Sequence, residues 1–431
     1  MTQRTRVLSL STLAALVAAA PILAATASSA IAAAQPTFYR DVLLVLQENC
    51  QACHRPAGLN MGGLLAPMSL VTFDEVRPWA KSIAKAVESR TMPPWHASEA
   101  FHGVFANERT LAPEQIATLV AWAKTGSPAG DPAAAPPPVS WPPAGWAIGE
   151  PDLILEMPET FQVADDVEDL YQNFTIDLPV TEERWIKAIE FRPGSSVVHH
   201  IIGYVVEPGT TYRDGSRGHV GGIAPGNDPE SFESGTGYPV RPGAKFVFAM
   251  HYHKEAGPGT ARPDHSIAAI KFYPKEEQGQ LRTVHIEAIG NGAFEIPPNH
   301  DHWQVGSARV FDRPIELFYL MPHMHLRGKA AKFFVTYPDG RNEMLLEVPR
   351  YDFGWQTTYT FRQPLVLPAG TRIDVELWFE NTPQRAAANG FSNDQAVRWG
   401  GPTTDEMDLG FLSFVYLDEE PAAATAATGA R

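Results

Sequence analysis

The chain has 431 residues, including 34 glycines and 38 prolines, and carries a formal net charge of −15 at pH 7. This length predicts two to four domains, and the excess of acid argues against nucleic acid or an anionic membrane as a partner. The many glycines and prolines favour β structure for most of the chain.

The first 34 residues are predicted to be a secretory signal peptide. Arg4 and Arg6 precede an apolar run, and small residues follow it up to Ala34, the expected last residue before cleavage. A membrane anchor is the alternative, but the run is interrupted by serine, threonine and proline. We therefore expect a periplasmic or secreted protein with no stable membrane insertion after cleavage.

Residues 50–54 read CQACH and contain both cysteines of the chain. Two cysteines separated by two residues can form a redox loop or half of a metal site. The spacing C-x-x-C followed directly by histidine is typical of covalent haem c attachment. Cys50 and Cys53 would bind the haem vinyl groups and His54 would ligate the iron, which leaves the β region free of disulfides.

The sixth ligand of that haem is predicted to be a methionine. Met61, Met68 and Met92 are candidates, and we favour Met92, because the two prolines after it hold an extended segment rigid. The stretch TMPPW also resembles the distal methionine segment of bacterial cytochrome c domains. The alternatives are a core methionine at this position and another residue, or none, on the iron.

Helical periodicity frames the haem motif. Three amphipathic stretches, with Gly126 as a C-cap, predict a small all-α cytochrome c domain over residues 35–127. A Pro/Ala-rich linker follows at 128–148.

The rest of the chain alternates apolar runs with turn residues, and no βαβ rhythm is present. It predicts two all-β, jelly-roll-like sandwich domains at 149–284 and 285–420. The tail at 421–431 is expected to be disordered.

Three histidine pairs lie in strand-like stretches: His199 with His200, His251 with His253, and His323 with His325. Imidazole binds zinc, copper, iron and nickel. Residues two apart on a strand share a face, whereas neighbours can reach one metal only where the strand twists or bulges. The alternative for each pair is a structural role in the core.

Four motifs occur in a fixed order in this region: VVHHIIGY, KFVFAMHYH, LMPHMHLRGK and GPTTDEMDLGFLSFVYLDEE. This set resembles the copper type II, ascorbate-dependent monooxygenases, the family that includes peptidylglycine α-hydroxylating monooxygenase and dopamine β-monooxygenase. The resemblance covers roughly residues 150–420.

The resemblance implies two copper ions. One would be held by His199, His200 and His251, and the other by the catalytic set His323, His325 and Met407. His253 has no counterpart and is interpreted as a spare or supporting residue. The two sites would face each other across a solvent-filled cleft.

The resemblance also implies an activity. O2 would be activated at the His–His–Met copper and a hydroxyl placed on a substrate C–H bond, while the tris-His copper stores the second electron. Ascorbate is a candidate reductant. The fused haem motif suggests a second route, in which a redox partner reduces the haem and the haem reduces the tris-His copper.

The chain departs from the peptide-acting members at the substrate anchor. Met321, Leu409 and Phe411 stand where those enzymes have arginine, asparagine and tyrosine. A buried carboxylate would be unpaired against this apolar wall. We therefore expect a small apolar or aromatic substrate and not a glycine-extended peptide.

Two other functions use the same residues. One is a periplasmic haem- and copper-containing electron-transfer or copper-binding protein without catalysis. The other is a zinc hydrolase, which lacks an H-E-x-x-H motif here and would not be expected to use a methionine ligand.

Overall fold

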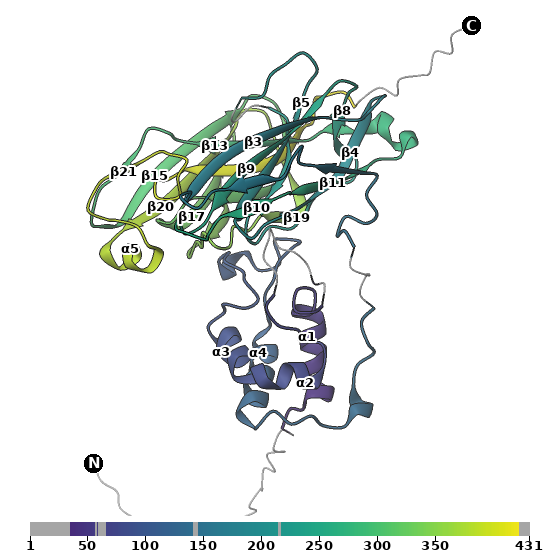
Figure 1. Ribbon diagram of the computed structural model, residues 1–431, viewed down its shortest axis with the longest axis vertical. Coiled ribbons are helices and arrows are strands. Elements are labelled where there is room, and N and C mark those ends of the chain that lie inside the picture. Colours follow the sequence, from purple (N-terminus) through teal and green to yellow (C-terminus); the bar gives the residue numbers. More distant parts are fainter. Residues whose placement is uncertain (1–34, 57, 59–65, 141–144, 214–216, 422–431) are drawn as a thin grey trace, which may run out of the picture. The chain divides into compact units, whose positions relative to one another are not determined.

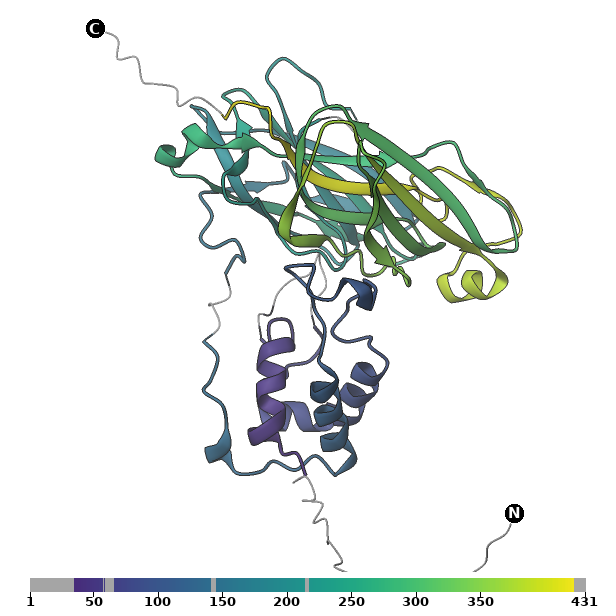
Figure 2. The ribbon, with the colours of Figure 1, turned by 180° about the vertical axis from the view of Figure 1, so that it is seen from behind.

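The computed structural model describes residues 35–56, 58, 66–140, 145–213 and 217–421 (Figure 1). The described residues from Pro36 onward belong to one compact unit. Helices gather in the early part of the chain and strands make up most of the remainder, as both views show (Figure 2). The expected signal peptide, Met61 and nearly all of the expected tail lie outside the described residues.

The helices are short. They are η1 (Phe38–Val42), α1 (Leu43–Asn49), α2 (Phe73–Val76), η2 (Arg77–Trp79), α3 (Ala80–Glu88), η3 (Glu99–Phe101), α4 (Pro113–Lys124), η4 (Pro132–Ala134), η5 (Lys275–Gln280) and α5 (Pro383–Asn389).

Local sequence sets the ends of the early helices. Thr72 and Glu75 form a reciprocal capping box at the start of α2, and Pro113 occupies the first turn of α4, where its missing N–H costs nothing. Gly126 follows α4 with a φ of 89°, the left-handed conformation that glycine adopts without strain. The apolar faces of these helices meet around Phe38, Leu46 and Trp122.

The strands follow from Leu153 onward. They are β1 (Leu153–Glu156), β2 (Phe161–Val163), β3 (Asp169–Asp177), β4 (Arg184–Arg192), β5 (Val198–Val206), β6 (His219–Ile223), β7 (Glu230–Ser231), β8 (Thr236–Val240), β9 (Lys245–His253), β10 (Arg262–Asp264), β11 (Ile267–Phe272), β12 (Arg282–Thr283), β13 (His285–Gly290), β14 (Glu295–Ile296), β15 (His300–Phe311), β16 (Ile315–His323), β17 (Gly328–Thr336), β18 (Asn342–Val348), β19 (Tyr359–Leu367), β20 (Thr371–Asn381), β21 (Val397–Arg398) and β22 (Leu409–Tyr416).

Within the described residues, the strands form four sheets of four or six strands and two two-stranded ladders. One four-stranded sheet has the order β3-β9-β5-β6, and a second has the order β13-β22-β16-β19. These two sheets carry the histidine pairs. All strand pairs in these two sheets are antiparallel. The local register of each pair decides on which face a histidine lies.

The expected fold class, a small all-α cytochrome c domain followed by two all-β jelly-roll-like sandwiches, is wrong. The chain is mostly β with a few short helices, and no self-contained all-α domain is present in the described residues. The expected sandwiches are not independent either. Phe318 and Val415, which belong to the second predicted sandwich, pack in the core formed mainly by the first.

The segment between α3 and α4 shows why the early part does not close on itself. Phe105 is fully buried in the β core and forms an isolated bridge with Phe361. The amide of Ala106 donates to the carbonyl of Thr360 at 2.8 Å, and the Trp95 ring contacts Tyr359 with centroids 5.1 Å apart. These apolar side chains are buried in a sheet core and not among helices.

Candidate metal centres

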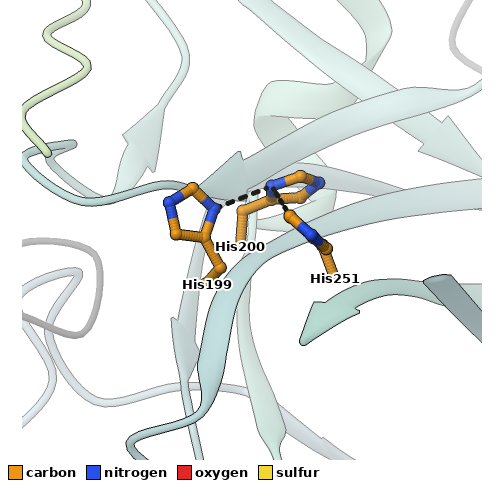
Figure 3. Close-up of side chains that lie close together, drawn as sticks. All are labelled: His199, His200 and His251. Carbon is orange, nitrogen blue, oxygen red and sulfur yellow. Dashed lines mark hydrogen bonds between the residues drawn. The ribbon is translucent and has the colours of Figure 1, made fainter. Parts of the chain in front are cut away.

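Three imidazoles converge where β5 and β9 run side by side (Figure 3). The Nδ1 atom of His200 lies 3.5 Å from Nδ1 of His199 and 3.3 Å from Nδ1 of His251. All three potential ligand nitrogens lie within 4.8 Å of one another. A first-row ion about 2 Å from each nitrogen fits such spacings. The cluster His199–His200–His251 could therefore hold a metal ion.

A β-bulge brings the two adjacent histidines together. Along the β5–β9 ladder, Val198 pairs with Tyr252, and His200 already pairs with His251. His199 is the extra residue on β5, and an extra residue breaks the alternation of faces. This is the distortion that a neighbouring pair of ligands requires.

Asp169 on β3 orients the cluster by accepting hydrogen bonds from two histidine rings. Its Oδ1 atom lies 2.7 Å from Nε2 of His251 and 3.1 Å from Nδ1 of His253, and Thr403 donates to Oδ2 at 2.9 Å. Since His251 donates through Nε2, its Nδ1 is left as the ligand atom. His253 shares the carboxylate and is a supporting residue at this site.

The charge state of Asp169 suits that role. Burial alone would raise the pKa of this carboxyl, but hydrogen bonds from His251, His253 and Thr403 outweigh the effect of burial and hold the pKa far below its usual range.

Tyr171 packs against the same cluster. Its ring is stacked on His251 at a centroid distance of 4.2 Å, and its hydroxyl donates to the carbonyl of Gly401.

The imidazoles of this cluster stay neutral. Burial, followed by the neighbouring histidines, lowers the pKa of His199 to about 2 and that of His200 well below its usual value. A neutral imidazole has a free lone pair, which is the form that binds metal. The cluster therefore keeps metal-binding nitrogens at neutral pH.

A second pair of imidazoles lies at the end of β16. His323 is the last residue of β16 and His325 lies just beyond it, so the two are not on one regular strand as expected. Their ring centroids are still only 5.3 Å apart, with the rings nearly perpendicular. The close approach is made by the strand end and the following turn.

Both imidazoles of this pair are held through Nδ1. His323 donates to Oε1 of Gln356 at 2.7 Å, and His325 donates to the carbonyl of Asp405 at 3.3 Å. Each keeps Nε2 free, and Nε2 of His325 is buried without a hydrogen-bond partner. Burial lowers the pKa of His323 to about 4 and that of His325 to about 3. A buried, neutral and unpartnered nitrogen is suited to a metal ion.

Met407 lies between two residues that are fixed beside this pair. The carboxylate of Glu406 accepts hydrogen bonds from the amides of His325 (2.8 Å) and Arg327 (2.6 Å). Two residues after Met407, Leu409 pairs with His323 on the β16–β22 ladder. Met407 is thus brought to the His323–His325 region from more than 80 residues away in the sequence.

The predicted apolar wall is assembled beside the same pair. Met321 and Phe411 are partners across the β16–β22 ladder, next to the partners His323 and Leu409. The Sδ atom of Met321 accepts from Asn227 and Thr358 at 3.6 and 3.5 Å. The structure therefore brings Met321, Leu409 and Phe411 together at one end of two adjacent strands.

One aromatic side chain, Phe353, contacts both histidine clusters. The ring of Phe353 stacks on His199 with centroids 4.6 Å apart and meets His325 edge-on at 5.8 Å. The bond from Thr403 to Asp169 is a second link, because Thr403 lies four residues before Met407. Residues 351–356 connect the clusters, since Gln356 also holds His323.

The CQACH motif follows α1, and no disulfide joins its two cysteines. Burial raises the pKa of Cys50 to about 12 and also raises that of Cys53, which disfavours a reactive thiolate pair. Nδ1 of His54 lies 3.3 Å from the carbonyl of Met68. This bond leaves Nε2 of His54 free, as an axial ligand requires.

The two described candidates for the sixth haem ligand, Met92 and Met68, differ in their contacts with His54. Met92 is 41% exposed, and no described contact joins its side chain to His54. Met68 packs against the helical core and contacts His54 through its backbone.

Several site residues carry no signal in the sequence. Asp169, Phe353 and Gln356 belong to no motif, and only the pairing of distant strands places them beside the histidines. Glu406 and Thr403 lie within a quoted motif, but their roles as backbone acceptor and carboxylate partner depend on the fold.

No protein-family model matches the chain, and a search of curated proteins finds no match either. Solved structures with some likeness include that of broad bean stain virus (10% identity, 57% of this chain and 81% of that chain covered, TM-score 0.27). Others are VP54 of PBCV-1 (9%, 61% and 93%, 0.25) and a Paenibacillus xanthan lyase (12%, 68% and 28%, 0.17). At such TM-scores these likenesses carry no argument about fold or function. Among the described residues, no helix has the length and apolarity needed to cross a membrane.

Proposed function

We propose that this chain is an exported, copper-dependent monooxygenase that hydroxylates a C–H bond of a small apolar or aromatic substrate. The observation that carries the proposal is the pair of neighbouring, oriented histidine clusters joined by Phe353. Their residues are those of the motifs that resemble the copper type II monooxygenases. The proposed location is the periplasm or the exterior of the cell.

The donor sets suit two coppers of different character. His199, His200 and His251 offer three imidazole nitrogens, which suit copper and also other first-row ions. His323 and His325 offer free Nε2 atoms, and Met407 would add a thioether, a soft ligand that favours Cu(I) and is unusual for zinc. The orphan Nε2 of His325 is the strongest structural support for a metal at the second cluster.

When bound, copper at the second cluster would supply O2 activation, and copper at the first would supply storage of one electron. The reaction places one oxygen atom in the product and releases the other as water, and it requires two electrons and two protons from a reductant.

The residues of the chain have positioning roles in this reaction. Asp169, Gln356 and the Asp405 carbonyl fix which nitrogen of each imidazole is free. Phe353 fills the space between the clusters, and Met321, Leu409 and Phe411 offer an apolar surface to substrate.

We also propose that Cys50, Cys53 and His54 bind haem c, which would relay electrons from a redox partner to the tris-His copper. The bond from His54 to the Met68 carbonyl supports this, because it orients the ring as an axial ligand. Replacing His54 should abolish turnover driven by a reduced cytochrome while leaving turnover with ascorbate. Unchanged cytochrome-driven turnover would contradict the haem route.

The experiment that tests the function is isotope labelling. The copper-loaded chain is given ascorbate, ¹⁸O₂ and a set of small alkylbenzenes with weak benzylic C–H bonds. We expect a hydroxylated product that carries ¹⁸O, and loss of that product in Met407→Ile. The matched control is Met344→Ile, since Met344 is an exposed residue of β18, the edge strand of a sheet that carries neither cluster.

The same experiment separates the alternative. A haem- and copper-containing electron-transfer protein would cycle between oxidation states and yield no labelled product. O2 uptake without ¹⁸O incorporation would favour that alternative and contradict the oxygenase.

A further inference from the structure

A cavity of about 520 Å³ is connected to the second histidine cluster through Phe411, whose ring centroid lies 6.3 Å from that of His323. Its lining comes from β5, β6, β13, β15 and β22, so it lies where strands of the first and second histidine-bearing sheets meet. Phe411, a residue of the apolar wall next to His323, forms part of it. A cavity of this size matches a small organic ligand.

A series of aromatic rings runs from the second cluster along this cavity. Phe411 lies 6.3 Å from His323 and 6.1 Å from His219, measured between ring centroids. His219 in turn lies 5.5 Å from Tyr204. Phe411, His219 and Tyr204 all line the cavity, so an aromatic ligand would find ring faces and edges along its length.

The charges of the cavity leave one cation without a partner. Arg309 pairs with Glu287, and Arg313 pairs with Asp418 and Glu419. Among the described residues, Arg217 makes no ion pair or hydrogen bond, and it is exposed. In a chain with a net charge of −15, an unpaired arginine at the edge of a cavity favours an anionic ligand.

The histidines of the cavity do not change this balance. Burial lowers the pKa of His219 to about 4. Burial also lowers the pKa of His285, and nearby Arg217 adds to that effect against the pull of Glu419 and Glu287. Both rings are therefore neutral at pH 7. Arg217 itself lines the cavity.

A second cavity of about 270 Å³ has the opposite character. Three carboxyl residues line it: Asp228, Glu230 and Glu233. Asp228 already pairs with Arg109, and no basic residue among those described lines this cavity, so it offers an anion no cation to pair with. The two cavities are therefore not interchangeable as binding sites for an acid.

We propose that the larger cavity binds the substrate and that the substrate is an aromatic carboxylate. Its ring lies along Phe411 and His219 toward His323, and its carboxylate pairs with Arg217 at the open end. This inference rests on the proposed function for the role of the ligand as substrate. In this arrangement the carboxylate of the substrate lies at the exposed Arg217 guanidinium, and its aromatic ring lies against the apolar wall.

The test is direct binding of 3-phenylpropionate to the full chain as purified, without reductant. We expect 3-phenylpropionate to bind about tenfold or more tightly than 3-phenylpropionamide, because only the acid can pair with Arg217. In Arg217→Gln that difference should vanish, and Arg217→Lys should retain part of it. Arg341→Gln, an exposed arginine on the β17–β18 turn, is the matched control and should bind like the wild type.

Equal affinity for acid and amide in the wild-type chain, or unchanged acid binding in Arg217→Gln, would overturn the proposal. Because binding is measured without turnover, it does not depend on the oxygenase assignment. Tight, Arg217-dependent binding with no ¹⁸O-labelled product would support the cavity and contradict the proposed function.

Discussion

The two histidine clusters lie side by side but are held by different chemistry. The cluster of His199, His200 and His251 is backed by a carboxylate, Asp169, whose pKa is held far below its usual range. The pair His323 and His325 is held by neutral acceptors, the amide oxygen of Gln356 and the carbonyl of Asp405.

The difference teaches how one chain can prepare two unlike metal sites. An imidazole that donates to a carboxylate is a more basic ligand than one that donates to a neutral oxygen. The first cluster therefore suits firm retention of an ion. The second, with weaker donors and a methionine nearby, suits an ion that must stay reduced and accessible.

The largest effect should come from removing a ligand from either cluster. We expect His325→Ala to lose one copper per chain and all labelled product, because its orphan nitrogen has no substitute. His199→Ala should lose the other copper and also abolish product. Metal analysis of each purified variant is the measurement, with His302→Ala, an exposed histidine of β15, as control. Full metal content in His325→Ala would break the comparison.

Asp169→Asn should have the next largest effect, confined to the first cluster. An amide cannot provide the charge that orients His251, and loss of such a partner typically weakens metal binding by about 10- to 100-fold. Competition with a chelator measures this affinity. Asp177→Asn, at the exposed end of the same strand, should leave it unchanged. If Asp169→Asn weakened metal binding equally at both clusters, the effect of Asp169 would be a general one on the fold and not a specific one on His251.

Gln356→Ala should weaken the second cluster by less, at the lower end of the same range or about tenfold. The lost bond is neutral, and His323 remains packed. Chelator competition again gives the affinity, with the exposed Gln304→Ala as control. An effect larger than that of Asp169→Asn would reverse the proposed order of the two anchors.

The smallest effect concerns pH. The strand of His323 also carries Tyr319, whose hydroxyl donates to Glu230 at 3.3 Å, and burial raises the pKa of Glu230 to about 8. The folded chain therefore holds a proton that the unfolded chain loses above about pH 4.5, so this contribution to stability disappears as the pH rises through 8. Asp169 has the opposite sign, because its lowered pKa stabilises the fold at neutral pH and the contribution is lost in acid.

Denaturant unfolding at pH 5 and pH 8 measures this contribution. Glu230→Gln should reduce the fall in the free energy of unfolding over that interval, and the exposed Glu233→Gln should not. If Glu230→Gln retains the full wild-type slope, Glu230 does not hold the proton.

Much of the candidate site could be predicted from residue spacing. The sequence motifs identified His199, His200 and His251, and the need for a bulge followed from the two-residue period of a strand. The bulge itself depends on the register of β5 against β9. The position of Phe353 depends on a loop that reaches both clusters, which no local pattern encodes.

The fold class is harder to predict, because helical periodicity in the sequence does not show whether the helices form a separate domain. The periodic stretches around α3 and α4 do form helices. Phe105 and Trp95, between them, carry no such period and pack against Phe361 and Tyr359 of the β region. Whether a segment forms a separate domain depends on where its apolar side chains are buried, and tertiary contacts decide that.

The measurement that tests the central claim most directly is metal analysis of the purified full-length chain. Two coppers per chain, with one lost in His251→Ala and the other in Met407→Ile, are the predicted result. Zinc in the histidine clusters, or a single copper that survives both substitutions, would contradict the account.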